Sequence, residues 1–95
     1  MKFAFIIMGE FNSKSDIAFI HDKTASIIGV SSVEEAQKIA KKLLKEGIDC
    51  IELCGAFGEK GAEEIIKATE NKIPIGYVTH LKKQEEIYKQ TFGKQ

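Results

Sequence analysis

Residues Ile48–Gly61, I-D-C-I-E-L-C-G-A-F-G-E-K-G, decide the fold of this chain. The segment begins as an apolar run with the character of a β-strand, and this run ends at Cys54. Gly55, Gly58 and Gly61 follow with the spacing G-x-x-G-x-x-G, and the helix-like sequence A-E-E-I-I-K-A continues from the last of them. A strand, a tight glycine turn and a helix N-terminus in series form a common place for a small protein to hold an anion. The segment therefore predicts an α/β fold with a candidate site at the glycine turn.

The rest of the chain repeats this alternation. Four strands are expected, at 3–8, 25–30, 49–54 and 73–78, and three helices, at 33–46, 60–70 and 81–92. Ser32 and Glu35 form a capping box at the start of the first helix. Such alternation implies β-α-β units, a parallel sheet and right-handed crossovers. We expect residues 1–95 to form one three-layer α/β domain with about four mostly parallel strands and helices on both faces. The fold would be flavodoxin-like or Rossmann-like, and the flavodoxin-like strand order is 2-1-3-4.

Residues 11–23 allow two interpretations. Asp16 could cap a short helix that carries Ile17 and Ile20, or residues 17–21 could form a short strand. We favour the helical turn. The connection between the first two predicted strands is just long enough for a crossover, which needs a dozen or more residues.

Composition excludes some classes of function. Lys plus Arg and Asp plus Glu each number 14, so the formal net charge is zero, and every cation is a lysine. The lack of arginine and of a basic stripe argues against nucleic-acid binding. Near-zero net charge removes one barrier to self-association, and we expect a homo-oligomer, most simply a dimer. The apolar run near the N-terminus is too short for a signal peptide or a membrane span, so no membrane association is expected.

The two cysteines, Cys50 and Cys54, indicate a reducing compartment. Four residues apart on one strand they would stand about 13 Å from each other, which is too far for a disulfide. Two cysteines without a further Cys/His pair also fall short of a zinc site. We therefore expect free thiols, no metal and a cytoplasmic protein. The glycine spacing matches neither the dinucleotide fingerprint nor the Walker loop, and no cofactor is expected.

The carboxyl ends of the strands give the place to look for a ligand, because open α/β sheets bind ligands there. Polar and glycine residues follow each predicted strand. The expected ligand-binding residues are Glu10, Ser31, Gly55, Phe57, Gly58 and Thr79. Phe57, between two turn glycines, would cover a ligand or pack on a partner subunit. We expect an open pocket at this edge, bounded by Cys54, Phe57 and His80.

Three side chains are candidates for catalysis. Cys54, at a strand end near a helix N-terminus, is a candidate nucleophile, and His80 at a neighbouring strand end is its candidate base. Each has a structural alternative, a small buried side chain for Cys54 and an exposed loop residue for His80. Glu52 shares a strand face with both cysteines and would be a partly buried carboxylate if helices cover both faces. Its alternative is an edge strand or a subunit contact.

The residues 51–58, I-E-L-C-G-A-F-G, carry a resemblance to a known family. With Pro74, Gly76, Val78 and Thr79 and the opening K-F-A-F-I, they resemble small bacterial proteins catalogued as a domain of unknown function. The resemblance covers most of the chain and implies a compact α/β fold. It implies no activity.

Three hypotheses of function follow. The first is a domain that binds a small anionic or carbonyl ligand. The second is a small enzyme, such as a lyase, isomerase or hydrolase, that uses Cys54 with Glu52 or His80. The third is a structural or regulatory homo-oligomer without a ligand.

Overall fold

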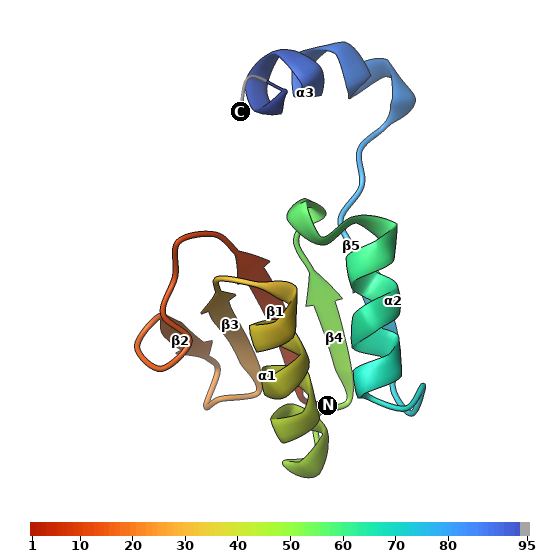
Figure 1. The fold of residues 1–95 in the computed structure, drawn as a ribbon. Helices are drawn as coiled ribbons and strands as arrows, with labels where there is room; N and C mark the ends of the chain where they lie inside the picture. Colours follow the sequence, from red (N-terminus) through yellow and green to blue (C-terminus); the bar gives the residue numbers. More distant parts are fainter. Residues whose placement is uncertain (94–95) are drawn as a thin grey trace.

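A computed structural model of the chain describes residues 1–93 and shows one α/β domain (Figure 1). Its elements are β1 (Phe3–Met8), β2 (Ile17–Ile20), β3 (Ala25–Val30), α1 (Val33–Lys45), β4 (Cys50–Leu53), the 3-10 turn η1 (Gly55–Phe57), α2 (Gly58–Ala68), β5 (Ile75–Tyr77), the 3-10 turn η2 (Lys82–Gln84) and α3 (Glu85–Phe92). The five strands form one sheet in the order β2-β3-β1-β4-β5, and only β2 runs antiparallel to its neighbour. The predicted class, a mostly parallel α/β sheet, is confirmed. The four predicted strands also have the predicted order 2-1-3-4, as β3, β1, β4 and β5.

The prediction of a helical turn at residues 11–23 is wrong, and the alternative strand is correct. Ile17–Ile20 forms β2, an edge strand paired with β3. Asp16 does not cap a following helix, because its carboxylate accepts a hydrogen bond from the N–H of Asn12 at 2.7 Å and closes the preceding turn. The hairpin between β2 and β3 then turns through three consecutive left-handed residues, 21–23, with φ between 49° and 68°. The connection is therefore a hairpin at the sheet edge.

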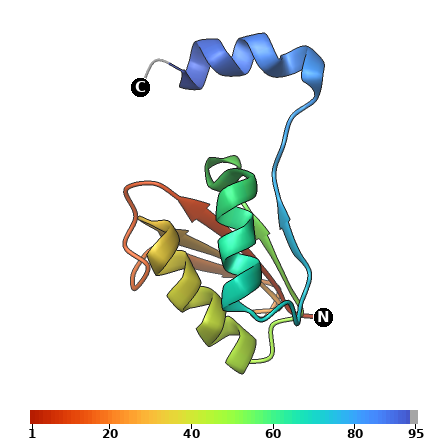
Figure 2. The ribbon, with the colours of Figure 1, turned by 45° about the vertical axis from the view of Figure 1, so that its right-hand side comes forward.

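Helices α1 and α2 cover the same face of the sheet (Figure 2). The core residues on that face come from the strands and from both helices: Ala4, Ile6, Ile28, Val30, Ile51, Leu53, Ala36, Ala40, Ala62 and Ile65. Both crossovers, from β3 to β4 and from β4 to β5, advance across the sheet in the same direction. Right-handed connections that advance in one direction place their helices on one face. The first connection runs the other way and would have placed a helix on the second face, but it forms β2 instead.

The second face of the sheet is therefore not covered by α1 or α2. From Phe3 to Ile7 of β1 and along β4 the buried residues alternate with half-buried ones, and these half-buried residues point to the second face. We call it the open face. It is formed by Phe3, Phe5, Ile7, Ala18, Ile20, Ala25, Ile27, Gly29, Cys50, Glu52 and Gly76. A third layer on this face remains a prediction.

The C-terminal segment, residues 78–93, stands away from the sheet and is called the arm. Its first part, residues 78–81, is called the connector, and residues 1–77 are called the body. After β5 the chain continues in extended form, and α3 then crosses beyond the carboxyl ends of the strands (Figures 1 and 2). No residue of α3 is buried. The arm lengthens the molecule, whose radius of gyration of 13.7 Å exceeds the roughly 12 Å expected for a compact chain of this size. Within residues 1–93, no helix is long and apolar enough to cross a membrane.

Candidate functional site

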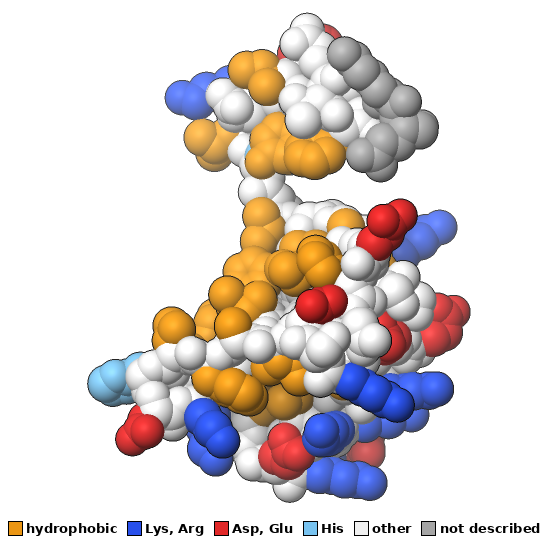
Figure 3. Space-filling view, turned by 90° about the vertical axis from the view of Figure 1, so that its left-hand side faces the viewer, with side chains coloured by type: hydrophobic (Ala, Val, Ile, Leu, Met, Phe, Trp, Pro, Cys, Tyr) orange, Lys and Arg blue, Asp and Glu red, His pale blue; other side chains and the backbone are white. Residues whose placement is uncertain are grey.

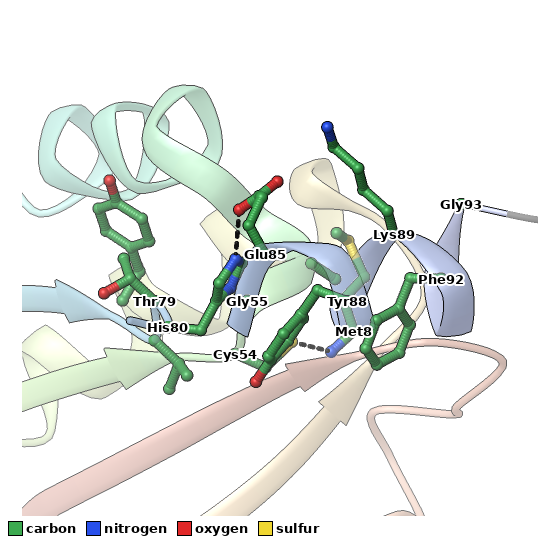
Figure 4. A pocket seen from close by; sticks show the side chains of 13 residues that line it. Met8, Cys54, Gly55, Thr79, His80, Glu85, Tyr88, Lys89, Phe92 and Gly93 are labelled. Atoms are coloured by element: carbon green, nitrogen blue, oxygen red, sulfur yellow. Dashed lines mark hydrogen bonds and ion pairs between the residues drawn. The ribbon is translucent and has the colours of Figure 1, made fainter. Parts of the chain in front are cut away.

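A cavity of about 1010 Å³ lies at the carboxyl ends of β1, β4 and β5, between the sheet and α3 (Figure 4). Its lining comes from β1, from the turn after β4, from the segment after β5 and from α3. The lining residues are Met8, Cys54, Gly55, Ala56, Tyr77, Val78, Thr79, His80, Glu85, Tyr88, Lys89, Phe92 and Gly93. The place agrees with the expectation for an open α/β sheet, and four of the residues named from sequence, Cys54, Gly55, Thr79 and His80, lie on the cavity wall.

Cys54 lies where β4 gives way to η1. Its backbone N–H donates to the carbonyl of Ile6 at 3.0 Å, which extends the β1–β4 ladder and fixes the direction of the side chain. The sulfur accepts a hydrogen bond from the N–H of Met8 at 3.3 Å (Figure 4). The thiol is half-buried, is not part of a disulfide and borders the cavity. A sulfur held this way has one fixed donor and one side open to a ligand.

His80 is held by two residues of α3. Its Nε2 lies 2.6 Å from Oε1 of Glu85, and its ring stacks on Tyr88 with a centroid distance of 3.7 Å and an interplanar angle of 11° (Figure 4). The hydrogen bond from His80 lowers the pKa of the Glu85 carboxyl, and the charge of Lys89 adds to this effect. An imidazole that is oriented by a carboxylate is the arrangement used to position a general base. The same contacts fix the angle at which α3 leaves the connector.

Glu52 lies on the open face and does not line the cavity. Its carboxylate rests over Gly76 of the neighbouring strand, and a Cβ at Gly76 would come within 2.5 Å of Oε1. Cys50 is on the same face, and its pKa is raised, first by burial and then by the charges of Glu52 and Asp49. The predicted catalytic set is therefore divided, with Cys54 and His80 at the cavity and Glu52 on the open face.

Phe57 is not at the cavity wall. Its side chain is only 5% exposed and belongs to the core, where it packs against Gly61. The expectation that its ring would bound the pocket is wrong. The reason is that η1 turns Phe57 inward, beneath the first turn of α2. Gly58 follows with φ of +63°, so its role in the structure is to supply a backbone conformation that other residues rarely adopt.

Glu10 and Ser31 also lie outside the cavity. Glu10 is exposed in the loop after β1. Ser31 donates from its N–H and its hydroxyl to Oε1 of Glu35, at 2.8 and 3.2 Å, and the hydroxyl of Ser13 donates to Oε2 at 3.0 Å. These hydrogen bonds, that from the Ser31 backbone above all, lower the pKa of the Glu35 carboxyl. The hydroxyl of Ser32 accepts from the N–H of Glu35, as the predicted capping box requires. The Glu35 carboxylate, however, accepts from Ser31 and not from the backbone of Ser32.

The cavity residues on α3 were missed by sequence reasoning. Glu85, Tyr88, Lys89 and Phe92 lie on one side of a predicted helix, but nothing in that pattern shows that the helix would extend across the strand ends. The only available signal was the spacing of Glu85 and Tyr88 after His80. No three His, Cys, Asp or Glu side chains among the described residues gather closely enough to hold a metal ion.

Comparisons with known proteins give a family and no activity. No curated protein and no solved structure matches the chain. A family model, described as a family of unknown function (DUF6506), matches residues 1–93. This match spans nearly the whole chain and agrees with the resemblance carried by residues 51–58. The chain belongs to the DUF6506 family of unknown function.

Proposed function

We propose that the protein binds a small anionic or carbonyl compound in the cavity at the carboxyl ends of its strands. The observation that carries this proposal is that the Cys54 thiol, the His80–Glu85 pair and residue Lys89 border one cavity. They come from two segments of the chain, the end of β4 and residues 80–89. The cavity also has an apolar wall to which Met8 and Tyr88 contribute, and sites for small molecules combine apolar walls with a few polar groups in this way.

The polar groups suit a ligand with a carboxylate, a phosphate or a carbonyl oxygen. Lys89 supplies a positive charge on the α3 side. On the sheet side, Gly55 and Ala56 are exposed, and their N–H groups begin the turn η1. Thr79 adds a hydroxyl beside His80. A bound oxygen atom would thus meet donors from both sides of the cavity.

A second candidate function, a thiol-dependent enzyme, is favoured by the position of Cys54. Its sulfur accepts the Met8 N–H and shares the cavity with an imidazole that a carboxylate orients. Such a thiol could add to a carbonyl carbon, with His80 taking the thiol proton. The two free thiols also support a cytoplasmic location, because free cysteines persist in reducing compartments.

The test uses the two cysteines of the same molecule. The protein is treated with iodoacetamide, and the modification of Cys54 and Cys50 is followed separately by peptide mass spectrometry. Cys50 is the internal control, because burial and two nearby carboxylates raise its pKa. We expect Cys54 to react several times faster than Cys50. Inorganic phosphate, acetate or pyruvate in the cavity would slow the Cys54 reaction and leave that of Cys50 unchanged.

Thermal shifts with the same three compounds give the second readout. Lys89→Ala should abolish the shift, whereas the matched control Lys83→Ala, which removes an exposed lysine outside the cavity lining, should retain it. Equal reaction rates for both cysteines would remove the support for the enzyme. The absence of any shift and of any protection would refute the binding proposal.

A further inference from the structure

The open face and the arm are complementary surfaces that the described chain leaves unpaired. Ile20 and Ile27 on the open face are 64% and 48% exposed, and Phe92 on the arm is 59% exposed. Figure 3 shows hydrophobic side chains that gather along one side of the body, continue up the connector and appear again on the side of α3 that faces the body. Exposed apolar surfaces of this extent on a soluble domain mark interaction sites.

The topology explains why the open face lacks its own helix. The connection that would have placed a helix there forms β2, and right-handed crossovers direct α1 and α2 to the opposite face. Within residues 1–93, α3 is the only helix that covers no face of the sheet. The sheet has one uncovered face that is apolar except for Glu52, and α3 is a helix with no packing partner in its own body, so the two form a matching pair.

The geometry of the connector directs α3 away from the open face of its own subunit. The backbone at Leu81 is extended, with φ of −65° and ψ of 147°. The contacts of His80 with Glu85 and Tyr88 then fix the start of α3 so that it continues beyond the strand ends. To lie on its own open face, α3 would have to reverse direction at residues 78 and 79, where the chain leaves β5. The open face of a second molecule can be reached without this reversal.

The open face also contains a groove of suitable size for the arm. It has a volume of about 160 Å³ and is lined chiefly by Phe3, Phe5, Ile20 and Ile27. An apolar cavity of roughly 150 Å³ holds a benzene molecule, so a groove of this size accepts one aromatic ring. The large apolar side chains of the two surfaces, Ile20, Ile27, Val78, Leu81, Ile87 and Phe92, are 45–66% exposed. At roughly 180 Å² each they expose about 600 Å² per subunit, which is the lower end of what each partner buries in a specific interface.

We propose that the protein is a homodimer with exchanged arms, in which Phe92 of each subunit enters the open-face groove of the other. The contact is made twice, once in each direction, as a two-fold symmetric pair requires. The exchange fixes the position of α3, which forms the outer wall of the cavity at the strand ends. The proposal does not depend on a ligand in that cavity, and its test uses none.

The experiment measures mass in solution by light scattering and sedimentation on the full chain. At tens of micromolar the wild type should show twice its chain mass of 10.6 kDa. Phe92→Glu changes a residue that is not buried, so the body should keep its fold, which circular dichroism checks. Phe92→Glu and Ile27→Glu should each raise the dissociation constant by at least about 100-fold. Gln90→Glu, an exposed polar position on the same helix, is the matched control and should remain dimeric.

Mixing the two variants identifies which surfaces meet. A Phe92→Glu subunit has an intact groove and an Ile27→Glu subunit has an intact arm, so an equimolar mixture should recover a heterodimer with one of the two contacts. If the dimer were instead held by contacts between two arms or between two open faces, the mixture would form no heterodimer. If Ile27→Glu fails to fold, Ile20→Glu changes a more exposed residue of the same groove. A monomeric wild type, a dimer indifferent to Phe92→Glu, or a mixture without recovery would overturn the proposal.

Discussion

Replacing Gly29 with alanine should destabilise the protein by displacing Phe11. The side chain of Phe11 lies over Gly29 and Gly9, and a Cβ at Gly29 would come within 2.7 Å of both Cβ and Cγ of Phe11. These two atoms are next to the Phe11 backbone, so rotation of the ring cannot remove the clash. The φ of Gly29 lies outside the left-handed region, and the backbone itself would accept alanine.

The magnitude follows from the area that Phe11 buries. Phe11 is 38% exposed, so more than half of its surface is covered. Loss of roughly 120 Å² of apolar burial costs about 3 kcal/mol at about 25 cal/mol per Å², which is an upper estimate. Alanine in place of glycine within a strand stabilises the folded state by about 0.5–1 kcal/mol, because alanine loses less backbone entropy on folding. We expect Gly29→Ala to lower the free energy of unfolding by about 2 kcal/mol.

A double-mutant cycle, measured by urea unfolding and circular dichroism, tests the cause. In a Phe11→Gly background, which removes Cβ as well as the ring, the clash is absent, and Gly29→Ala should change from a cost to a gain of about 0.5 kcal/mol. Gly9→Ala is the matched comparison. Its Cβ would meet the ring edge of Phe11 at 2.8 Å, which the ring can leave by rotation, so its cost should be smaller. A neutral Gly29→Ala, or one whose cost is unchanged by Phe11→Gly, would refute this explanation.

Three further predictions concern the described fold. Thr69→Val should lower the free energy of unfolding by about 1 kcal/mol, because the fully buried Thr69 hydroxyl donates to the carbonyl of Ile65 at 2.9 Å; chemical unfolding measures it, and no loss would show that this hydrogen bond is dispensable. Gly58→Ala should cost about 2 kcal/mol, because φ there is +63° and alanine rarely adopts it; thermal unfolding checks this, and an unchanged melting temperature would contradict it. Glu35→Gln should destabilise the protein at neutral pH. The pKa of Glu35 is lowered in the folded state, so its contribution to stability is present above its unfolded pKa of 4.5 and is lost as the pH falls through the folded value. The unfolding free energies of the wild type and Glu35→Gln, measured against pH, should therefore converge in acid. A difference that stays constant with pH would contradict this role of Glu35.

The order of the sheet could be predicted from the sequence because local signals were strong. The capping box at Ser32, the apolar faces of the two covering helices and the uninterrupted apolar run of β1 each favour one structure. The prediction of a helical turn at residues 17–20 was wrong for a physical reason. Their pattern of apolar residues fits one helical turn as well as a short strand, and the pairing partner that decides between them, β3, comes later in the chain.

The candidate site could be predicted only in part. Cys54, Gly55, Thr79 and His80 follow strands directly, so the rule for parallel sheets places them together. Phe57 could not be placed, because its direction depends on the 3-10 turn after Cys54. The contribution of α3 could not be predicted either, since it depends on the exit angle that the side chain of His80 sets through its contacts with Glu85 and Tyr88.

The separation of the arm from the body has a consequence for folding. Within residues 1–93 every fully buried residue precedes β5, so the body forms its core without the arm. A newly folded single chain therefore has its open face in water. Glu52, a carboxylate on that face, gives the sheet a charge that opposes aggregation of such chains.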